Sequence, residues 1–206
     1  MLRFVLFLVV TFAKDSLVFT ELKNEDGDAV GFTVIEFDKC YYYKNNTSVY
    51  FIHDGDNVKV WLYNSSSSCS GVRIEQNSNI HDDALKNYCE DANRCSVEIK
   101  KPPKHIGSHS VVEDDKNCTH RDNIFKAYYT GKCYKCNEGK NYYCNYKEKN
   151  GYMWENVYQN NKCTSKETVE QTPQWECNVC KNGFMFQCGS TSTTVISITI
   201  LLSLIL

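Results

Sequence analysis

Apolar and polar residues alternate along the first half of the chain as they do in half-buried β-strands. Residues 30–37 alternate β-forming side chains, and residues 48–53 and 57–63 form two apolar and aromatic runs. The Asp-Gly-Asp sequence at 54–56 separates these runs and is a strong hairpin signal, because tight hairpin turns favour residues that accept a positive φ. Residues 95–100 indicate a further strand.

One short stretch has helical spacing instead. The apolar residues fall at helical spacing, namely Ile80, Ala84, Leu85 and Tyr88. Asp82 and Asp83 fall in the first turn of such a helix, where acidic side chains suit the helix dipole. The predicted fold class is therefore mostly β, with a small antiparallel β domain and one short helix in residues 14–101.

Both chain ends are strongly apolar. Residues 1–13 combine the basic Arg3 with an apolar run too short to span a bilayer, and we interpret them as a signal peptide. Residues 189–206 end in an apolar tail that follows small residues, the pattern of a GPI-attachment signal, with a short uncleaved membrane anchor as the alternative. The candidate anchor sites are Gly189, Ser190 and Ser192.

Charge and cysteine content narrow the function classes. The formal net charge is −2 and no basic stripe is present, so nucleic acid is not an expected partner. Twelve cysteines in an exported chain indicate a disulfide framework, because small modules bury too little apolar surface to be stable without one. The candidate glycosylation sites, each beginning an Asn-x-Ser/Thr sequence, are Asn45, Asn46, Asn64 and Asn117.

The cysteines fall into three groups of four. They are Cys40, Cys69, Cys89 and Cys95; Cys118, Cys133, Cys136 and Cys144; and Cys163, Cys177, Cys180 and Cys188. We expect the disulfides to stay within each group, which leaves three pairings open in each. The last two groups share the register C-x-x-C-x-x-G-x-x-x-x-C, and such self-similarity predicts two disulfide-rich repeats with little regular structure, residues 118–144 and 163–188. The Pro-Pro segment in 102–117 is the predicted linker.

The repeat pattern resembles the growth-factor-receptor or furin-like cysteine-rich repeats, which also occur in variant and GPI-anchored surface proteins of parasitic protozoa. CNVCKNGFMFQC at 177–188 carries the cysteines, the glycine Gly183 and the aromatic Phe184 of that pattern, whereas the copy at 133–144 lacks the aromatic. The resemblance covers about residues 118–188. It implies a cell-surface binding or coat protein in which the repeats serve as scaffold.

The CxxC motifs raise two other chemistries, zinc binding and redox catalysis. Exported thiols oxidise and each motif has matching extra cysteines, so we predict structural disulfides, no metal and no cofactor. A redox dithiol needs a lowered thiol pKa, usually at a helix N-terminus, and neither motif has that context. His105, His109 and His120 lie close in sequence, but Pro102 and Pro103 argue against a helix, so we expect solvated loop histidines.

Acidic and aromatic clusters are the remaining candidates. His53 with Asp54 and Asp56 is a candidate acid–base group, although a hairpin turn is the simpler interpretation. His81, which precedes two aspartates, is more simply the start of a helix. The aromatic candidates for a sugar- or protein-binding face are Tyr41, Tyr42, Tyr43, Trp61, Trp154 and Trp175. Packing of small disulfide-rich cores explains such rings more simply.

These observations lead to three hypotheses. The first is a cell-surface, GPI-anchored glycoprotein without catalytic activity that acts as a coat, adhesion or ligand-binding protein. Its membrane contact is the lipid anchor or the C-terminal tail, and its ligand is a protein or a glycan. The second is a secreted glycan-binding lectin or adhesin that uses aromatics of the first domain. The third is a secreted hydrolase that uses Asp54 and Asp56.

Overall fold

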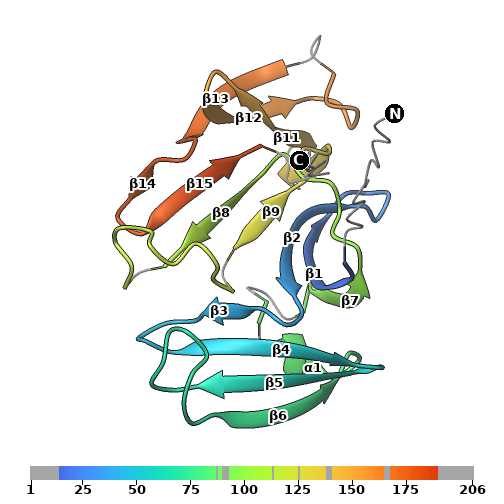
Figure 1. Cartoon of the computed structure of the whole chain (residues 1–206). Coiled ribbons are helices and arrows are strands. Elements are labelled where there is room, and N and C mark those ends of the chain that lie inside the picture. Colours follow the sequence, from blue (N-terminus) through green and yellow to red (C-terminus); the bar gives the residue numbers. More distant parts are fainter. Residues whose placement is uncertain are drawn as a thin grey trace, which may run out of the picture.

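The chain folds into three antiparallel sheets (Figure 1). The computed structural model describes residues 14–86, 88–89, 93–112, 114–124, 126–137, 141–164 and 168–189. Over those ranges the fold has one four-residue helix, and the remaining regular structure is strand. The predicted mostly β, disulfide-rich fold is confirmed.

The largest sheet has seven strands in the order β14-β15-β8-β9-β2-β1-β7. They are β1 (Ser16–Lys23), β2 (Ala29–Glu36), β7 (Ser96–Lys100), β8 (Gly107–Val111), β9 (Ala127–Tyr129), β14 (Cys180–Lys181) and β15 (Phe184–Cys188). This sheet therefore unites strands from the first domain, the linker and both repeats that the sequence predicts.

Two four-stranded sheets lie below and above the seven-stranded sheet in Figure 1. The first contains β3 (Cys40–Tyr42), β4 (Ser48–Asp54), β5 (Asn57–Tyr63) and β6 (Ile74–Asn79), and helix α1 (Asp83–Lys86) follows it. The second contains β10 (Tyr134–Asn137), β11 (Tyr142–Lys149), β12 (Tyr152–Tyr158) and β13 (Thr168–Glu176). The repeats at 118–144 and 163–188 hold more regular structure than the sequence predicts, since β9, β10, β13, β14 and β15 lie within them.

The predicted hairpin is confirmed. Strands β4 and β5 pair antiparallel from Ser48 opposite Tyr63 to Asp54 opposite Asn57. Gly55 occupies the turn with a φ of +64°, which glycine adopts without steric cost. The predicted strand over 95–100 and the short helix after Asp82 also form, as β7 and α1.

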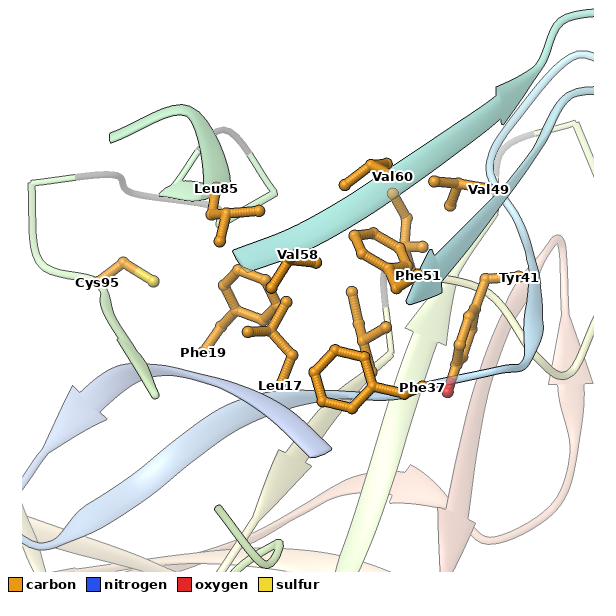
Figure 2. Packing of buried hydrophobic residues seen from close by; sticks show 12 residues of the cluster. Leu17, Phe19, Phe37, Tyr41, Val49, Phe51, Val58, Val60, Leu85 and Cys95 are labelled. Carbon is orange, nitrogen blue, oxygen red and sulfur yellow. The ribbon is translucent and has the colours of Figure 1, made fainter. Parts of the chain in front are cut away.

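The main hydrophobic core lies between the first four-stranded sheet and one end of the seven-stranded sheet (Figure 2). Leu17 and Phe19 of β1 meet Phe51 of β4 and Val58 of β5, all with no exposed surface. Leu85 of α1 covers this cluster from the side, which explains why so short a helix is stably placed. Strand alternation explains why the strand side chains of this cluster point inward, because every second residue of a strand lies on the same face of the sheet.

All twelve cysteines are paired in six disulfides. The first group closes on itself, with Cys40 bonded to Cys69 and Cys89 to Cys95. The expectation that the second and third groups do the same is wrong. The two bonds that join these groups are Cys118–Cys180 and Cys133–Cys163, and only Cys136–Cys144 and Cys177–Cys188 stay within a group.

The repeats match in sequence register but not in bonding. In the first repeat the second cysteine of CxxC bonds the last cysteine, whereas in the second repeat the first cysteine of CxxC does so. The cysteine left over in each repeat bonds the opening cysteine of the other repeat. The physical reason is that a disulfide needs Cα atoms roughly 4.4–6.8 Å apart. The three-dimensional fold, and not sequence spacing, decides which cysteines meet that condition.

Candidate ligand groove and aromatic cluster

A half-open groove lies beside β6, the edge strand of the first four-stranded sheet. Its volume is about 510 Å³, within the range of roughly 300–1,000 Å³ found for small-molecule sites. The described residues that line it are Val60, Gln76, Asn77, Ser78, Ala84 and Tyr88. Strands β5 and β6 therefore form one wall, and the segment that contains α1 forms the other.

Strand register places two polar side chains on the groove side of β6. Gln76 lies opposite Val60, and Ser78 lies opposite Val58. Residues opposed in an antiparallel pair share one face of the sheet, so Gln76 and Ser78 share the face of the two buried valines. Gln76 is exposed, whereas Ser78 retains only 9% of its surface.

These polar groups have no protein partner in the described part of the chain. Neither the Gln76 amide nor the Ser78 hydroxyl forms a hydrogen bond with another described residue. The Ser78 hydroxyl is not among the buried side-chain atoms without a partner, which in the described ranges are Thr20 Oγ1, Trp61 Nε1 and Ser96 Oγ, so it stays in contact with solvent. The groove therefore presents hydrogen-bonding groups that a ligand or water must satisfy.

Tyr88 supplies the aromatic wall of the groove. Its ring meets the edge of Phe51 with ring centroids 5.4 Å apart. Burial raises the pKa of the Tyr88 phenol, with a smaller contribution from Tyr43, so the hydroxyl stays protonated at neutral pH. Among the described residues this hydroxyl has no hydrogen-bond partner either, and it can both donate and accept.

A second candidate is a set of stacked rings between the seven-stranded sheet and the second four-stranded sheet. This His109 cluster consists of His109, Tyr129, Tyr146, Trp175, Phe184 and Phe186. Trp175 of β13 stacks on Phe186 of β15 with centroids 5.0 Å apart and planes 6° from parallel. The Tyr129 hydroxyl lies 2.9 Å from Nδ1 of His109.

The His109 cluster is mainly a packing core. Phe186 has no exposed surface, and Gly107 lets it approach the neighbouring strand closely. A Cβ at Gly107 would lie 2.7 Å from the Phe186 ring and 2.8 Å from the Gln187 carbonyl oxygen. Burial lowers the pKa of His109, which favours the neutral ring, and this ring forms a hydrogen bond with the Tyr129 hydroxyl. The interpretation of Trp175 as a core-packing ring therefore fits its contacts.

The sequence predicts solvated loop histidines, but His105 and His109 pack against neighbouring rings instead. His105 retains 9% of its surface and meets Tyr128 with ring centroids 4.7 Å apart, whereas His109 contacts Tyr129. Tyr128 and Tyr129 are consecutive residues of β9 and point to opposite faces of the sheet, so the two histidines contact opposite faces. The segment is not helical, as predicted, but His105 is buried just before β8 and His109 is half-buried on β8. The described ranges contain no cluster of three or more potential metal ligands.

The acidic residues of the β4–β5 hairpin do not form a catalytic pocket. His53, Asp54 and Asp56 are all exposed, and Nε2 of His53 lies 2.7 Å from the carbonyl oxygen of Gly55. Asp54 forms a 2.6 Å ion pair with Lys59, and the hydrogen bond from Lys59 lowers the pKa of that carboxyl. The turn interpretation fits this geometry, and the hydrolase hypothesis loses its basis.

A similar conclusion holds at the start of α1. The Asp82 carboxylate accepts a 2.7 Å hydrogen bond from the backbone N–H of Asn79, and His81 donates its own N–H to the Asn79 side chain at 3.1 Å. Asp83 pairs with Lys86 at 2.8 Å. These groups fix the turn before the helix, which is the simpler interpretation of the His-Asp-Asp sequence.

The tyrosines after Lys39 do not form an exposed binding face. Tyr41 and Tyr42 retain 5% and 6% of their surfaces, and Tyr43 packs against the main core. The Tyr42 hydroxyl donates a short hydrogen bond to Asp114, and its ring stacks on His120. Tyr42 therefore fastens β3 to the loop that follows β8.

Trp61 and Trp154 are, like Trp175, partly exposed, and each has its own contacts. Trp61 stacks on Tyr50, and the Arg73 guanidinium lies 3.5 Å from the centre of the Trp61 ring. Arg73 also pairs with Glu75 at 2.6 Å. Trp154 donates its indole N–H to the backbone of Lys149 at 3.1 Å. These rings are covered or anchored, so they present less stacking surface than the sequence indicates.

The four candidate glycosylation asparagines are all exposed: Asn45, Asn46, Asn64 and Asn117. The Asn46 side chain donates a 3.3 Å hydrogen bond to the carbonyl of Ser65, beside one of the other sites. The backbone N–H of Asn45 donates a 2.6 Å hydrogen bond to Asp114, three residues before another. Sites far apart in sequence thus gather at one corner of the molecule.

Parts of the terminal predictions lie outside the described residues. These are the signal peptide at 1–13, Ser190 and Ser192, while Gly189 is the last described residue. Within the described ranges, helices of the length and apolar character needed to cross a bilayer are absent.

Comparisons with protein-family models, curated proteins and solved structures find no match to this chain. The resemblance of residues 118–188 to furin-like repeats therefore stays a prediction.

Sequence reasoning misses the groove residues Gln76, Ser78 and Tyr88 as a site. The segment Ile74–Asn79 is polar, so its strand character gives no alternation of apolar residues. The signal available was the Gln-Asn-Ser-Asn run at 76–79, just before a predicted helix. Such a run of uncharged hydrogen-bonding side chains is unusual next to a core strand.

Proposed function

We propose that this chain is an exported cell-surface glycoprotein that acts in binding, adhesion or coating of the cell rather than in catalysis. A lipid anchor or the C-terminal tail holds it at the membrane. The observation that carries the proposal is the complete pairing of twelve cysteines, with two bonds that join distant parts of the chain. Such disulfides form and persist in the oxidising secretory pathway and are rare in the reducing cytosol.

The sequon corner supports the same proposal. Oligosaccharyl transfer needs accessible asparagines, and all four candidates are exposed. Glycans attached at these sites would cover that corner of the molecule.

Surface labelling of cells that express the full chain, tagged after residue 13, tests the proposal. We expect labelling at the surface, release by phosphatidylinositol-specific phospholipase C, and a mass decrease after removal of N-linked glycans. An Asn64→Gln variant is expected to lose one glycan without losing surface arrival. An unlabelled intracellular protein with reduced cysteines would contradict the proposal.

A further inference from the structure

Two hairpins of this fold share the same turn sequence. Lys149-Asn150-Gly151-Tyr152 joins β11 to β12, and Lys181-Asn182-Gly183-Phe184 joins β14 to β15. In both, the lysine pairs with the aromatic residue across the turn. The asparagine and glycine have φ angles of 54° and 75° in the first turn, and of 54° and 85° in the second. The two turns therefore match in local sequence and conformation, and they differ in their surroundings.

We propose that Asn150 is a site of spontaneous deamidation and that the fold protects Asn182 from the same reaction. In an Asn-Gly sequence the backbone nitrogen of the glycine can attack the side-chain amide carbon of the asparagine, because glycine has no Cβ to hinder the approach. The reaction needs only water. The proposal therefore goes beyond the proposed function and does not depend on it.

The atoms of the reaction at Asn150 balance with water as the co-reactant. The Gly151 nitrogen forms a bond to Cγ of Asn150, and the bond from Cγ to Nδ2 breaks. The proton of the Gly151 nitrogen leaves with the amide nitrogen as ammonia. Water then opens the resulting cyclic imide. Cleavage between the nitrogen and Cγ gives aspartate, whereas cleavage between the nitrogen and the main-chain carbonyl carbon gives isoaspartate.

The Asn150 turn leaves the reacting groups open. Asn150 and Gly151 are both exposed, and a Cβ at Gly151 would meet no other atom within 4 Å. Neither the Gly151 N–H nor the Asn150 side-chain amide forms a hydrogen bond with another described residue. The attack therefore breaks no hydrogen bond of the attacking nitrogen or of the attacked amide, and solvent can take up the proton.

The Asn182 turn holds the attacking nitrogen in place. The N–H of Gly183 donates a 3.2 Å hydrogen bond to the carbonyl oxygen of Lys116, and the Gly183 carbonyl accepts a 3.1 Å hydrogen bond from Val112. Gly183 is buried, and a Cβ there would lie 2.4 Å from the Val112 carbonyl oxygen. Attack by Gly183 must break the bond to Lys116, and the net loss of one hydrogen bond slows a reaction about tenfold.

The Asp-Gly turns of the chain are poorer substrates for this chemistry. They are Asp26-Gly27 and Asp54-Gly55. An ionised carboxylate repels the attacking nitrogen and lacks the amide leaving group, and Asp54 is engaged in its 2.6 Å ion pair with Lys59. Isomerisation of an aspartate also leaves the mass unchanged, whereas deamidation replaces an amide by a carboxylate and changes the mass.

Deamidation changes both the charge and the shape of the β11–β12 hairpin. It places a carboxylate next to Lys149. Isoaspartate also lengthens the main chain by a methylene, which a two-residue turn cannot absorb without altering the pairing of the strands. The Gly151 carbonyl accepts a 2.8 Å hydrogen bond from the N–H of Cys177. We therefore expect isoaspartate to loosen the contact between this hairpin and Cys177.

The test ages the full chain, exported from eukaryotic cells with its six disulfides formed, at neutral pH. Samples are digested at intervals, and mass spectrometry follows the conversion of amide to carboxylate in the Asn150 and Asn182 peptides. The matched control is the same protein reduced, alkylated and kept in urea, where the two turn sequences lose their different surroundings. An Asn150→Asp variant identifies the aspartate product, and an isoaspartate-specific methyltransferase labels the other product.

We expect Asn150 of the folded protein to convert about tenfold faster than Asn182 or more, and both to convert at similar rates in the unfolded control. Removing the nearby bond with Cys118→Ala and Cys180→Ala frees the Lys116 segment, so it should raise the rate at Asn182. In aged protein the amide hydrogen of Cys177 should exchange with solvent faster than in fresh protein.

Three results would overturn the inference. The first is equal conversion of Asn150 and Asn182 in the folded protein. The second is an Asn150 that does not convert in the folded protein over a period in which the unfolded control reacts. The third is a difference between the two asparagines that persists in the unfolded control, because local sequence and not the fold would then set the rates.

Discussion

Because the Cys118–Cys180 bond joins the two repeats, we predict that removing it lowers the free energy of unfolding. The perturbation is the double variant Cys118→Ala with Cys180→Ala, which removes the bond without leaving a thiol. The bond spans 62 residues, and a cross-link lowers the entropy of the unfolded chain more when the closed loop is longer. A bond that closes a loop of that length, with no other bond inside it, should contribute about 4.3 kcal/mol to the free energy of unfolding at 25 °C.

The Cys133–Cys163 bond lies inside this loop and shortens it, since it spans 30 residues. The effective loop is then roughly 32 residues, so the double variant should lose about 3.7 kcal/mol of unfolding free energy. The matched control removes Cys89–Cys95, which spans six residues. Its expected loss is about 2.2 kcal/mol by the same relation. The expected difference between the two double variants is therefore about 1.5 kcal/mol.

Urea denaturation without reductant, followed by tryptophan fluorescence, measures both losses. The Cys118/Cys180 variant should also melt about 10 °C below the unmodified protein, given roughly 2–4 °C per kcal/mol for a chain of this size. If this variant loses no more stability than the Cys89/Cys95 variant, the long-range bond does not constrain the unfolded chain as argued. Wild-type stability in the Cys118/Cys180 variant would refute the bond itself.

Three further predictions concern packing and pH. Gly107→Ala should destabilise the protein by about 1–3 kcal/mol in urea denaturation, because its Cβ would clash with Phe186; wild-type stability would show that the sheets are packed less closely. Phe51→Ala should cost about 3–5 kcal/mol because Phe51 has no exposed surface, and a loss under 1 kcal/mol would mean the core is elsewhere. Burial lowers the folded-state pKa of His105 and His109, so the unfolded chain binds protons that the folded chain excludes, and stability should fall as the pH decreases through about 6.5. Replacing both histidines by glutamine should flatten this profile in denaturation series from about pH 8 to pH 5, and an unchanged profile would assign the pH dependence to other groups.

Local elements of this fold could be predicted because their signals are local. The hairpin at residues 54–56 follows from turn chemistry between two apolar runs, and α1 follows from acidic residues before apolar ones at helical spacing. Long-range pairing has no comparable signal. The seven-stranded sheet places β8 between β15 and β9, an order that depends on the packing of the whole chain.

The disulfides and the groove show the same limit. Two identical cysteine registers favour two closed repeats, but the strands bring Cys133 beside Cys163, with Cα atoms 5.7 Å apart. Ser78 and Gln76 come to line one groove only when β6 pairs with β5. Neither fact is contained in residue spacing.

The most direct test of the account is a disulfide map of the protein recovered from the cell surface. Protease digestion without reduction, followed by mass spectrometry, identifies each linked peptide pair. We predict peptides that join Cys118 to Cys180 and Cys133 to Cys163, with no unpaired thiol. Linkages confined to residues 118–144 and 163–188, or unpaired CxxC thiols, would contradict both the fold of this region and the proposal of an exported, cross-linked surface protein.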